Sequence, residues 1–502
     1  MVEWAGPLVP PTLFAVFPLF VLFAHNQTEL ERGELWRPFA ICVISAAVIY
    51  GLFALVFRNG PKACALASLV IVAFYFYGSA ARQVSGWGLG GGWFDALWLV
   101  LLVLGFFAVV RTTRPLGNLT LFLIISAVVL CVGPVARIAI YQVNHQPVAV
   151  TDPRLWPTRL EQPVPAAARR PLRDIYVLIP DDYARPDILR HYFHYEDAAF
   201  LRALKKRGFV ISDQARSPYS DSEMNIAAEL NMDYLNGLAG ILGKRSQDVR
   251  PVSRLIQDNR AARLLRPLGY RYVHLDTDEV TYAARNPDIS SVAVPDSFAN
   301  LWLRDTALGL FGGRLGFDEA AAEERFRKSI RSTLAKLEAV PQTQGLKFVV
   351  FHTLLPHDPY IFGEHGQALS FPNRSDEALG SRRGMRFYLQ QLKFVNGKLL
   401  EVIDTIRAHS KRPPVIVIQS DEGFQANADN FGEAAMRDIR IKGLTALYLP
   451  GAARTGVPRP PNTVNTLRFV FNKYLGTHYK LLRSASYPEL DFPYQFKEMR
   501  VR

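Results

Sequence analysis

The chain has 502 residues, of which 49% are hydrophobic and 21% are charged. The first 150 residues hold eight basic and five acidic side chains, which leaves 50 of the 58 basic and 40 of the 45 acidic residues for the other 352. That remainder is about one quarter charged, as is usual for soluble domains. This distribution excludes a single soluble globule, a disordered chain and a transporter that uses the whole chain.

Five apolar stretches in the first 142 residues are long enough to cross a membrane. The first contains Pro10, Pro11 and Pro18, which membrane helices tolerate. It also lacks the basic flank and the small-residue cleavage site of a signal peptide. We therefore predict an all-α transmembrane anchor of about five helices over residues 1–142, with spans at 8–25, 37–57, 62–81, 93–110 and 119–141.

Basic residues in the short loops indicate the orientation of the anchor. The loops after the second and fourth spans carry Arg58, Lys62, Arg111 and Arg114, whereas the loops after the first and third spans are acidic or almost uncharged. Basic loops favour the cytoplasmic side, so the N-terminus is expected there. Five spans then place the rest of the chain outside the cytoplasm. The three cysteines all lie in predicted spans, so we expect no disulfide in the outer part.

A proline-rich segment separates the anchor from an outer domain. Residues 143–172 contain six prolines and are predicted to form an extended linker. From residue 173 to 502, short β-branched runs alternate with helical patterns, which is typical of an α/β domain with a mostly parallel central sheet covered on both faces. The expected strands are 174–180, 271–276, 347–356, 414–420 and 445–451, and the expected helices are 196–207, 223–235, 253–266, 317–339, 383–409 and 463–475.

Acidic and imidazole side chains follow three of these strands. Asp181-Asp182 follow the first strand, His357-Asp358 the third and Asp421-Glu422 the fourth. Ligands of such sheets bind at the carboxyl ends of the strands. Carboxylates held close together repel unless a cation is present, and an oxygen shell suits Mg²⁺, Mn²⁺ or Ca²⁺. Turns also favour Asp, but two pairs directly after apolar strands favour a metal site.

A nucleophile candidate lies in the segment 216-RSPYSDSEMN-225. Ser222 directly precedes a helical pattern, and a helix N-terminus stabilises an anion such as phosphate. A metal that contacts the hydroxyl would lower its pKa and favour nucleophilic attack. Ordinary helix capping by Ser222 is the alternative interpretation. Ser217 and Ser220 are further candidates.

Five blocks of the outer domain together resemble a known family. They are 175–209, 216–235, 350–362, 416–423 and 463–476. In this order they are similar to the membrane-anchored sulfatase-like proteins of the alkaline phosphatase superfamily, whose members include lipoteichoic acid synthases and phosphoethanolamine transferases. The resemblance covers about residues 174–490. It implies an alkaline phosphatase/sulfatase-like domain behind about five spans, located on the extracytoplasmic (periplasmic) side of a bacterial inner (plasma) membrane.

The resemblance also implies roles for individual residues. Asp181 corresponds to the first metal-ligating Asp, Ser222 to a Thr nucleophile that also binds the metal, and Asp421 to the Asp of a Ser-Asp-His-Gly motif. His357 matches a His of a Pro-His-x-Pro block that binds phosphate or protonates a leaving group, and His352 is a second candidate for substrate binding. His365, in the loop 363-GEHGQ-367, could also reach substrate, although loop polarity explains it equally well.

The chain departs from the family pattern at three positions. Asp182 stands where the family usually has Gly, Ser222 where it has Thr, and Glu422 where it has a ligating His. Glutamate can ligate a hard cation, so this change favours an oxygen-only site that includes Glu422 and possibly Asp182, and argues against zinc. The same change admits a degenerate site without turnover. The sulfatase signature Cys/Ser-x-Pro-x-Arg is absent around Ser222.

We therefore expect a membrane-anchored, metal-dependent phosphotransferase or phosphodiesterase that acts on phosphate esters of envelope lipid or glycan. The alternatives are a catalytically silent scaffold that binds the envelope, and a sulfuric ester hydrolase. Of the net charge of +13, +10 belongs to the residues after 150, which could attract anionic headgroups or acidic glycans. No motif supports nucleic-acid binding.

Overall fold

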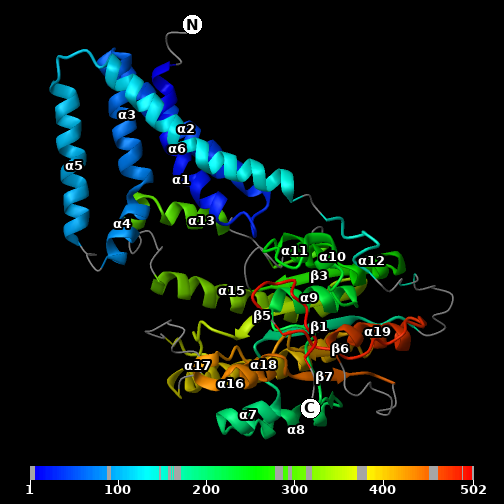
Figure 1. Cartoon of the computed structure of the whole chain (residues 1–502). Helices are drawn as coiled ribbons and strands as arrows, with labels where there is room; N and C mark the ends of the chain where they lie inside the picture. The colour runs from blue at the N-terminus through cyan, green and yellow to red at the C-terminus, as the bar shows by residue number, and fades with distance from the viewer. Residues whose placement is uncertain are drawn as a thin grey trace. The chain divides into compact units, whose positions relative to one another are not determined.

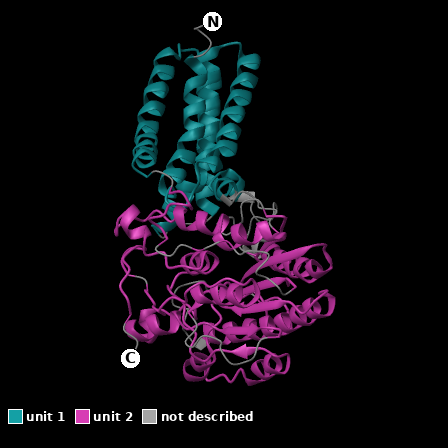
Figure 2. Cartoon of the chain, turned by 90° about the vertical axis from the view of Figure 1, so that its right-hand side faces the viewer, with its two compact units in different colours: residues 1–147, 294–322 teal, residues 148–293, 323–502 magenta. Residues whose placement is uncertain are grey.

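The computed structural model divides the chain into two compact units (Figure 2). Unit 1 comprises Met1–Pro147 and Val294–Ala322, and unit 2 comprises Val148–Ala293 and Glu323–Arg502. The residues that the structure describes are 6–87, 92–145, 148–156, 160, 162, 171–277, 287–291, 297–311, 319–369, 382–451, 462–488 and 490–499.

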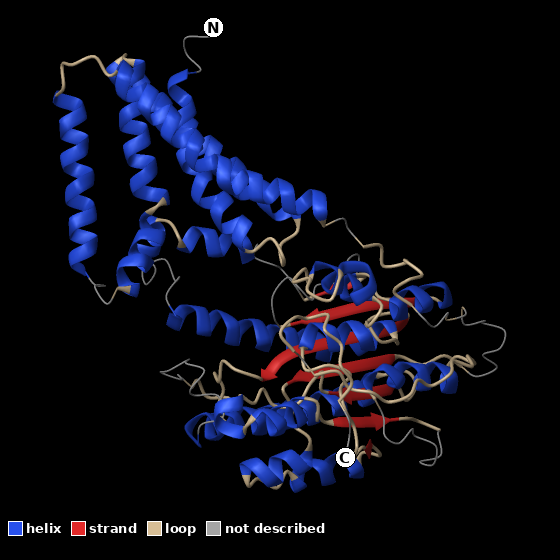
Figure 3. Cartoon of the chain, in the orientation of Figure 1, coloured by secondary structure: helices blue, strands red, loops and turns tan. Residues whose placement is uncertain are grey.

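Unit 1 is built from apolar helices (Figures 1 and 3). Its main helices are α1 (Val9–His25), α2 (Trp36–Phe57), α3 (Gly60–Tyr75), α4 (Tyr77–Gly86), α5 (Gly92–Arg111) and α6 (Gly117–Asn144). Among the described residues, four helices are long and apolar enough to cross a membrane, and a fifth span results if α3 and α4, which meet at a bend of 49°, count as one. The predicted bundle of about five apolar N-terminal helices is confirmed. Its exposed surface is apolar, as shown by Leu104, which is 61% exposed on α5.

A helix from the later part of the chain packs within unit 1. The helix α13 (Ser297–Arg304) places Trp302 and Phe298 in the bundle, where each is only 2% exposed. The Trp302 ring stacks on Tyr75 with 5.7 Å between ring centres, and Phe298 meets Phe23 edge-on at the same distance. Sequence reasoning places this segment in the outer domain. The structure groups it with the helical unit because its aromatic side chains are buried there.

The turn after α13 fits closely against the start of α4. The backbone N–H of Gly78 donates to the Asp305 carbonyl at 3.0 Å, and a Cβ atom at Gly78 would lie only 2.5 Å from that oxygen. Arg82 also donates to the Asp305 carboxylate, with one nitrogen–oxygen distance of 2.6 Å. No side chain fits at position 78, so glycine is required there.

Unit 2 contains a seven-stranded sheet in the order β2-β7-β6-β1-β5-β3-β4. Its strands are drawn in red in Figure 3. The pairs β1–β5, β1–β6, β3–β5 and β3–β4 are parallel, whereas β7 runs antiparallel to both β6 and β2. The prediction of a mostly parallel sheet is confirmed. The strands are β1 (Ile175–Asp181), β2 (Val210–Ile211), β3 (Tyr270–Asp276), β4 (Ile289–Ser290), β5 (Leu346–Pro356), β6 (Val415–Gln419) and β7 (Thr445–Tyr448).

Helices cover both faces of the sheet because the central strands are apolar on both. Every residue of β1 is buried, and alternate side chains enter opposite clusters: Tyr176 and Leu178 lie in one, Ile175 and Val177 in the other. The first cluster is completed by α7 (Pro186–Phe193), α8 (Ala198–Lys206), α15 (Glu319–Ala339) and α16 (Arg382–His409). The second is completed by α9 (Ser222–Asn231), α11 (Arg250–Gln257), α12 (Arg260–Leu265) and α19 (Thr463–Tyr474).

Part of the predicted linker packs on unit 2. Val148 and Leu155 are buried in its second cluster, and the Arg260 guanidinium lies 4.7 Å from the centre of the Trp156 ring. Residues 157–159, 161 and 163–170 of the linker lie outside the described residues. Residues 148–156 of the predicted linker therefore belong to unit 2, whereas residues 143 and 144 continue α6 of unit 1.

Candidate active site

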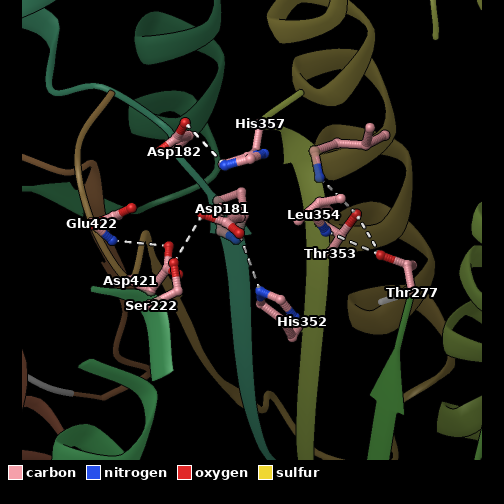
Figure 4. A network of polar contacts seen from close by, with 12 residues as sticks. Asp181, Asp182, Ser222, Thr277, His352, Thr353, Leu354, His357, Asp421 and Glu422 are labelled. Atoms are coloured by element: carbon pink, nitrogen blue, oxygen red, sulfur yellow. Dashed lines mark hydrogen bonds and ion pairs between the residues drawn. The ribbon is translucent and has the colours of Figure 1, made fainter. Parts of the chain in front are cut away.

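The ends of three adjacent strands bring the predicted acidic and imidazole groups together (Figure 4). Asp181 is the last residue of β1, Asp421 and Glu422 follow β6 closely, and His357 directly follows β5. Because β5 and β6 flank β1 on its two sides, their ends meet around Asp181. The parallel register at this edge places Ile179 beside His352 of β5.

The helix α9 presents Ser222 to this cluster. The side chain of Asp221 caps the helix by accepting the Met224 backbone N–H at 2.9 Å, so Ser222 is not the capping residue. The Ser222 hydroxyl instead donates to Asp181 Oδ1 at 3.4 Å. The other two serine candidates, Ser217 and Ser220, are 1% and 2% exposed, whereas Ser222 is only partly buried. Ser222 is thus a candidate that is both partly exposed and hydrogen-bonded to the carboxylate of Asp181.

Paired hydrogen bonds hold the loop that precedes α9. The Tyr219 backbone N–H donates to Asn225 Oδ1 at 2.9 Å, and Asn225 Nδ2 returns a bond to the Tyr219 carbonyl at 3.1 Å. The Tyr219 hydroxyl accepts the Leu235 backbone N–H at 2.6 Å. The start of α9, and with it Ser222, is therefore fixed relative to the sheet.

The carboxylates of the site are buried and close together. Asp181, Asp182, Asp421 and Glu422 are each at most 3% exposed. Two overlapping sets each offer three ligand atoms that lie within 4.8 Å of one another, and Asp181 belongs to both. One set is Asp181, His352 and Asp421, and the other is Asp181, Asp182 and Glu422.

Burial and mutual repulsion perturb these carboxylates. Burial, followed by the negative charge of Asp181, raises the pKa of Asp421 to about 7. Burial also raises the pKa of Asp182 against the opposing attraction of His357, and that of Glu422 against the attraction of Arg440. A divalent cation would remove this repulsion.

Unsatisfied oxygens in the same cluster fit a cation. Asp182 Oδ1, Asp421 Oδ2 and Glu422 Oε2 are buried without a hydrogen-bond partner among the described residues. Buried polar atoms are nearly always satisfied, and a bound ion satisfies several at once. The donor set of carboxylates, one hydroxyl and one imidazole matches what divalent cations take. The residues present therefore fit a divalent metal.

The imidazole of His357 lies at the open side of the cluster. Its Nδ1 donates to the Asp358 backbone carbonyl at 2.6 Å, which leaves Nε2 on the side of Asp182, 3.9 Å from Oδ2. Burial by itself lowers the pKa of His357, but the charges of Asp182, Asp181 and Asp358 outweigh it and raise the pKa to about 10. The surrounding carboxylates therefore favour the protonated form of this ring.

His352 is buried, and its imidazole contacts Asp276, a residue that the sequence analysis does not predict as part of the site. Its Nδ1 lies 3.1 Å from Asp276 Oδ1, and its Nε2 lies 3.8 Å from Asp181 Oδ2. Asp276 is the last residue of β3 and is paired in register with His352. Its position at a strand end is the same signal that identified Asp181. His274, on the same strand as Asp276, is 1% exposed, and its Nε2 lies 3.7 Å from Asp276 Oδ2.

His365 is placed differently from the other histidines. Its side chain is 84% exposed, and its Nε2 pairs with Glu364 at 3.3 Å. Among the described residues, no contact links His365 to Asp181, Asp421 or Ser222. The structure thus brings together all the predicted site residues except His365.

Comparison with known proteins identified solved structures that align with this chain at low sequence identity. No protein-family model and no curated protein sequence matches the chain. The zinc complex of the C-terminal periplasmic domain of EptC from Escherichia coli is 12% identical, with a TM-score of 0.40 over 62% of this chain and 84% of that one. The lipooligosaccharide phosphoethanolamine transferase EptA from Neisseria meningitidis is 13% identical, with a TM-score of 0.37 over 87% of this chain and 88% of that one. A protein of the alkaline phosphatase superfamily from Vibrio parahaemolyticus is 13% identical, with a TM-score of 0.39 over 66% and 73%.

Proposed function

We propose that the protein is a metal-dependent phosphotransferase or phosphodiesterase of the bacterial envelope, anchored in the inner membrane by unit 1. The observation that carries the proposal is the Ser222 hydroxyl, which donates to Asp181 inside a buried carboxylate cluster at the edge of the sheet. The sequence resemblance to membrane-anchored sulfatase-like proteins supports the same chemistry. The basic outer part and the apolar helices are consistent with a substrate that is an anionic phosphate ester of the membrane.

In the proposed reaction, each step is carried out by a residue of this chain. Ser222 Oγ forms a bond to phosphorus while its proton passes to Asp181 Oδ1, the acceptor at 3.4 Å. The bond from phosphorus to the leaving oxygen breaks, and His357 Nε2 gives that oxygen a proton. In the second half, an acceptor hydroxyl or water loses its proton to His357 and attacks the phosphorus of the phosphoserine. The bond from phosphorus to Ser222 Oγ breaks, and Oγ takes back its proton from Asp181.

The N-terminus of α9 supports the same substrate. Backbone N–H groups at a helix start and the helix dipole attract a phosphate group. Asp181, Asp421 and their neighbours would hold a divalent cation, which would supply charge neutralisation and polarisation of the phosphoryl oxygens. Together these features favour phosphate over a neutral ester.

The proposal is tested with the full chain purified in detergent, bis(p-nitrophenyl) phosphate or a labelled phospholipid as substrate, and added Mn²⁺ or Mg²⁺. We expect turnover that EDTA abolishes and that Ser222→Ala lowers by about 10³-fold or more. The matched control is Ser410→Ala, because Ser410 lies before β6, at the opposite edge of the sheet, and should leave turnover unchanged.

The same assay separates the alternatives. Turnover that survives Ser222→Ala contradicts the assigned nucleophile. Faster hydrolysis of p-nitrophenyl sulfate than of the phosphodiester would identify a sulfuric ester hydrolase. Absence of both metal binding and turnover would identify a catalytically silent scaffold.

A further inference from the structure

A buried chain of polar groups leads from the cluster into the core, and the proposed reaction does not use it. It begins at His352 and continues through Asp276 and His274 to Tyr272, whose hydroxyl lies 2.9 Å from His274 Nδ1. Asn259 Nδ2 donates to the same hydroxyl at 3.0 Å. Burial of several polar groups costs free energy, so this arrangement of residues calls for a functional explanation.

The chain fixes which nitrogen of His352 faces the cluster. The carboxylate of Asp276 accepts from Nδ1 at 3.1 Å, so the proton on that nitrogen is held away from Asp181. Nε2 is consequently the atom directed at Asp181, with a separation of 3.8 Å (Figure 4). A histidine that donates one N–H to a carboxylate and presents the other nitrogen is the arrangement seen at metal ligands in proteins.

The atoms around Nε2 complete a set of ligands. The atoms that Asp181, His352 and Asp421 offer lie within 4.8 Å of one another, and the Ser222 hydroxyl is 3.4 Å from Asp181 Oδ1. Asp421 is 1% exposed, and its Oδ2 has no hydrogen-bond partner among the described residues. The Ser222 side chain also acts on Asp421, which belongs only to the set with His352, so Ser222 adjoins the set that includes a nitrogen.

Glu422 belongs to the other set. Its ligand atom lies within 4.8 Å of the ligand atoms of Asp182 and Asp181. The positive charge of Arg440 stabilises its ionised form. The side chain that stands in place of the family's ligating histidine is thus partly balanced by an arginine. The imidazole missing at position 422 is supplied by a different strand.

We propose that His352 Nε2 is the nitrogen ligand of the catalytic cation, that Asp181, Asp421 and Ser222 supply its oxygen ligands, and that Asp276 is the positioning residue that holds the imidazole. This inference rests on the proposed function and specifies its metal centre. A shell of mixed nitrogen and oxygen favours Mn²⁺ or Zn²⁺ over Ca²⁺ or Mg²⁺, in contrast to the oxygen-only shell expected from Glu422 alone.

The test uses the full chain in detergent with Mn²⁺ alone as the probe. Electron spin-echo envelope modulation detects a ¹⁴N nucleus that is bonded to Mn²⁺. We expect ¹⁴N modulation in the native protein and its loss in His352→Gln. His357→Gln and Glu422→Gln are the matched controls, in which the modulation should remain.

The role of Asp276 is tested by metal affinity. Asp276→Ala should weaken Mn²⁺ binding by about 10- to 100-fold, because the freed imidazole rotates away from the cation. Asp276→Asn keeps an acceptor oxygen for Nδ1 and should recover part of that loss together with the ¹⁴N modulation. A purely structural role for Asp276 would affect folding without this graded recovery.

Three outcomes overturn the inference, and they are distinguishable. Native protein that binds Mn²⁺ without ¹⁴N modulation, or modulation that survives His352→Gln, removes the nitrogen ligand but leaves the proposed function intact. Native protein that binds no Mn²⁺ contradicts both the inference and the proposed function. The first result needs no variant, so it stands even where a substitution prevents folding.

Discussion

Asp182 combines a buried carboxylate with a left-handed backbone. Its φ angle is 58°, and its side chain is 2% exposed. The Tyr388 hydroxyl donates to its backbone carbonyl at 2.8 Å and holds the peptide in place. Glycine adopts this backbone freely, whereas Asp is one of the few other residues found there. The glycine expected at this position from the family pattern is therefore explained by the backbone, and the added carboxylate is particular to this chain.

Substitution of Asp182 separates the effect of backbone from that of charge. We expect Asp182→Gly to be more stable than Asp182→Ala by about 1 kcal/mol, because both remove the charge but only Gly suits the positive φ. Thermal unfolding of the full chain in detergent measures the difference. Equal or greater stability of the Ala variant would show that the left-handed backbone is not maintained.

The burial of Glu229 leads to a prediction of how folding stability depends on pH. It is a fully buried residue of α9, and burial, with a smaller contribution from the charge of Asp421, raises its pKa to about 8. Between the ordinary pKa of 4.5 and about 8, the unfolded chain has released this proton while the folded chain still binds it. Folding stability therefore decreases as pH rises through this window, and the loss is complete above it.

Glu229→Gln removes this titration. We expect the melting temperature of the variant to rise relative to that of the native protein by a few degrees between pH 5 and pH 9. The reason is that Gln keeps the shape of the side chain and stays neutral at both pH values. Melting curves of both proteins across the pH range provide the measurement. If the melting temperatures of the native protein and of Glu229→Gln changed with pH in the same way, the claim that Glu229 is a buried neutral acid would be disproved.

Part of the site can be predicted from single residues, and part cannot. Asp181 and Asp421 follow continuous apolar strands, and this pattern alone indicates the edge of a sheet. Asp276 ends a strand as well, but its importance depends on β3 lying beside β5, which the sequence does not reveal. For the same reason His274 resembles an isolated histidine in sequence and is part of a buried polar chain in the structure.

At the scale of elements, the segments that follow β1 and β6 are hydrogen-bonded to each other next to the site. The Ser420 hydroxyl donates to the Pro180 carbonyl at 2.8 Å and accepts the Tyr183 backbone N–H at 2.9 Å. The Leu444 backbone N–H donates to the Tyr183 carbonyl at 2.9 Å. A Cβ atom at Gly443 would lie 2.6 Å from the Glu422 carbonyl. The position of the Glu422 backbone therefore depends on the absence of a side chain at Gly443.

A glycine substitution tests this close packing. Gly443→Ala should lower stability by about 1–3 kcal/mol and weaken metal binding, because the backbone of Glu422 must move. Gly397→Ala in α16 is the matched control: a Cβ atom there meets nothing within 4 Å, and Ala is expected to add up to about 1 kcal/mol. Thermal unfolding and Mn²⁺ titration of both variants give the comparison, and equal effects would refute the packing argument.

Most of the longer strands and helices follow from periodicity, whereas the short elements α7, α13, β2 and β4 are not indicated by it. Two further differences have local causes. The predicted helix 253–266 is two helices, α11 and α12, because Asn259 starts a new helix by accepting the Ala262 backbone N–H. The strand β7 is antiparallel to β6, which an apolar run cannot indicate. Strand direction is set by the connection through the intervening chain, and its hydrophobic pattern is the same in either direction.

At the scale of the whole molecule, the chain passes between the two units more than once. The segment Val294–Ala322 belongs to unit 1 although the chain on both sides of it belongs to unit 2. The eight-residue helix α13 is too short for a membrane span, so hydropathy does not identify it. Its membership in unit 1 depends on packing of Trp302 and Phe298, which only the structure reveals.

The orientation in the membrane gives a prediction for the complete protein. Lys411 on unit 2 and Arg114 in the loop before α6 are both exposed, and the three native cysteines are buried. In spheroplasts, a membrane-impermeant maleimide should label Lys411→Cys and leave Arg114→Cys unlabelled until the membrane is opened. The reverse pattern would place unit 2 in the cytoplasm and contradict a role in the envelope.

The central claim is that Ser222 carries a covalent phosphoryl group during turnover. The most direct measurement is peptide mass spectrometry of the full chain, quenched in acid during turnover of a phosphodiester with Mn²⁺. We predict a phosphoryl adduct on the peptide that contains Ser222, dependent on the cation and absent in Ser222→Ala. Cation-dependent turnover by Ser222→Ala, or an adduct on a different residue, would contradict the account.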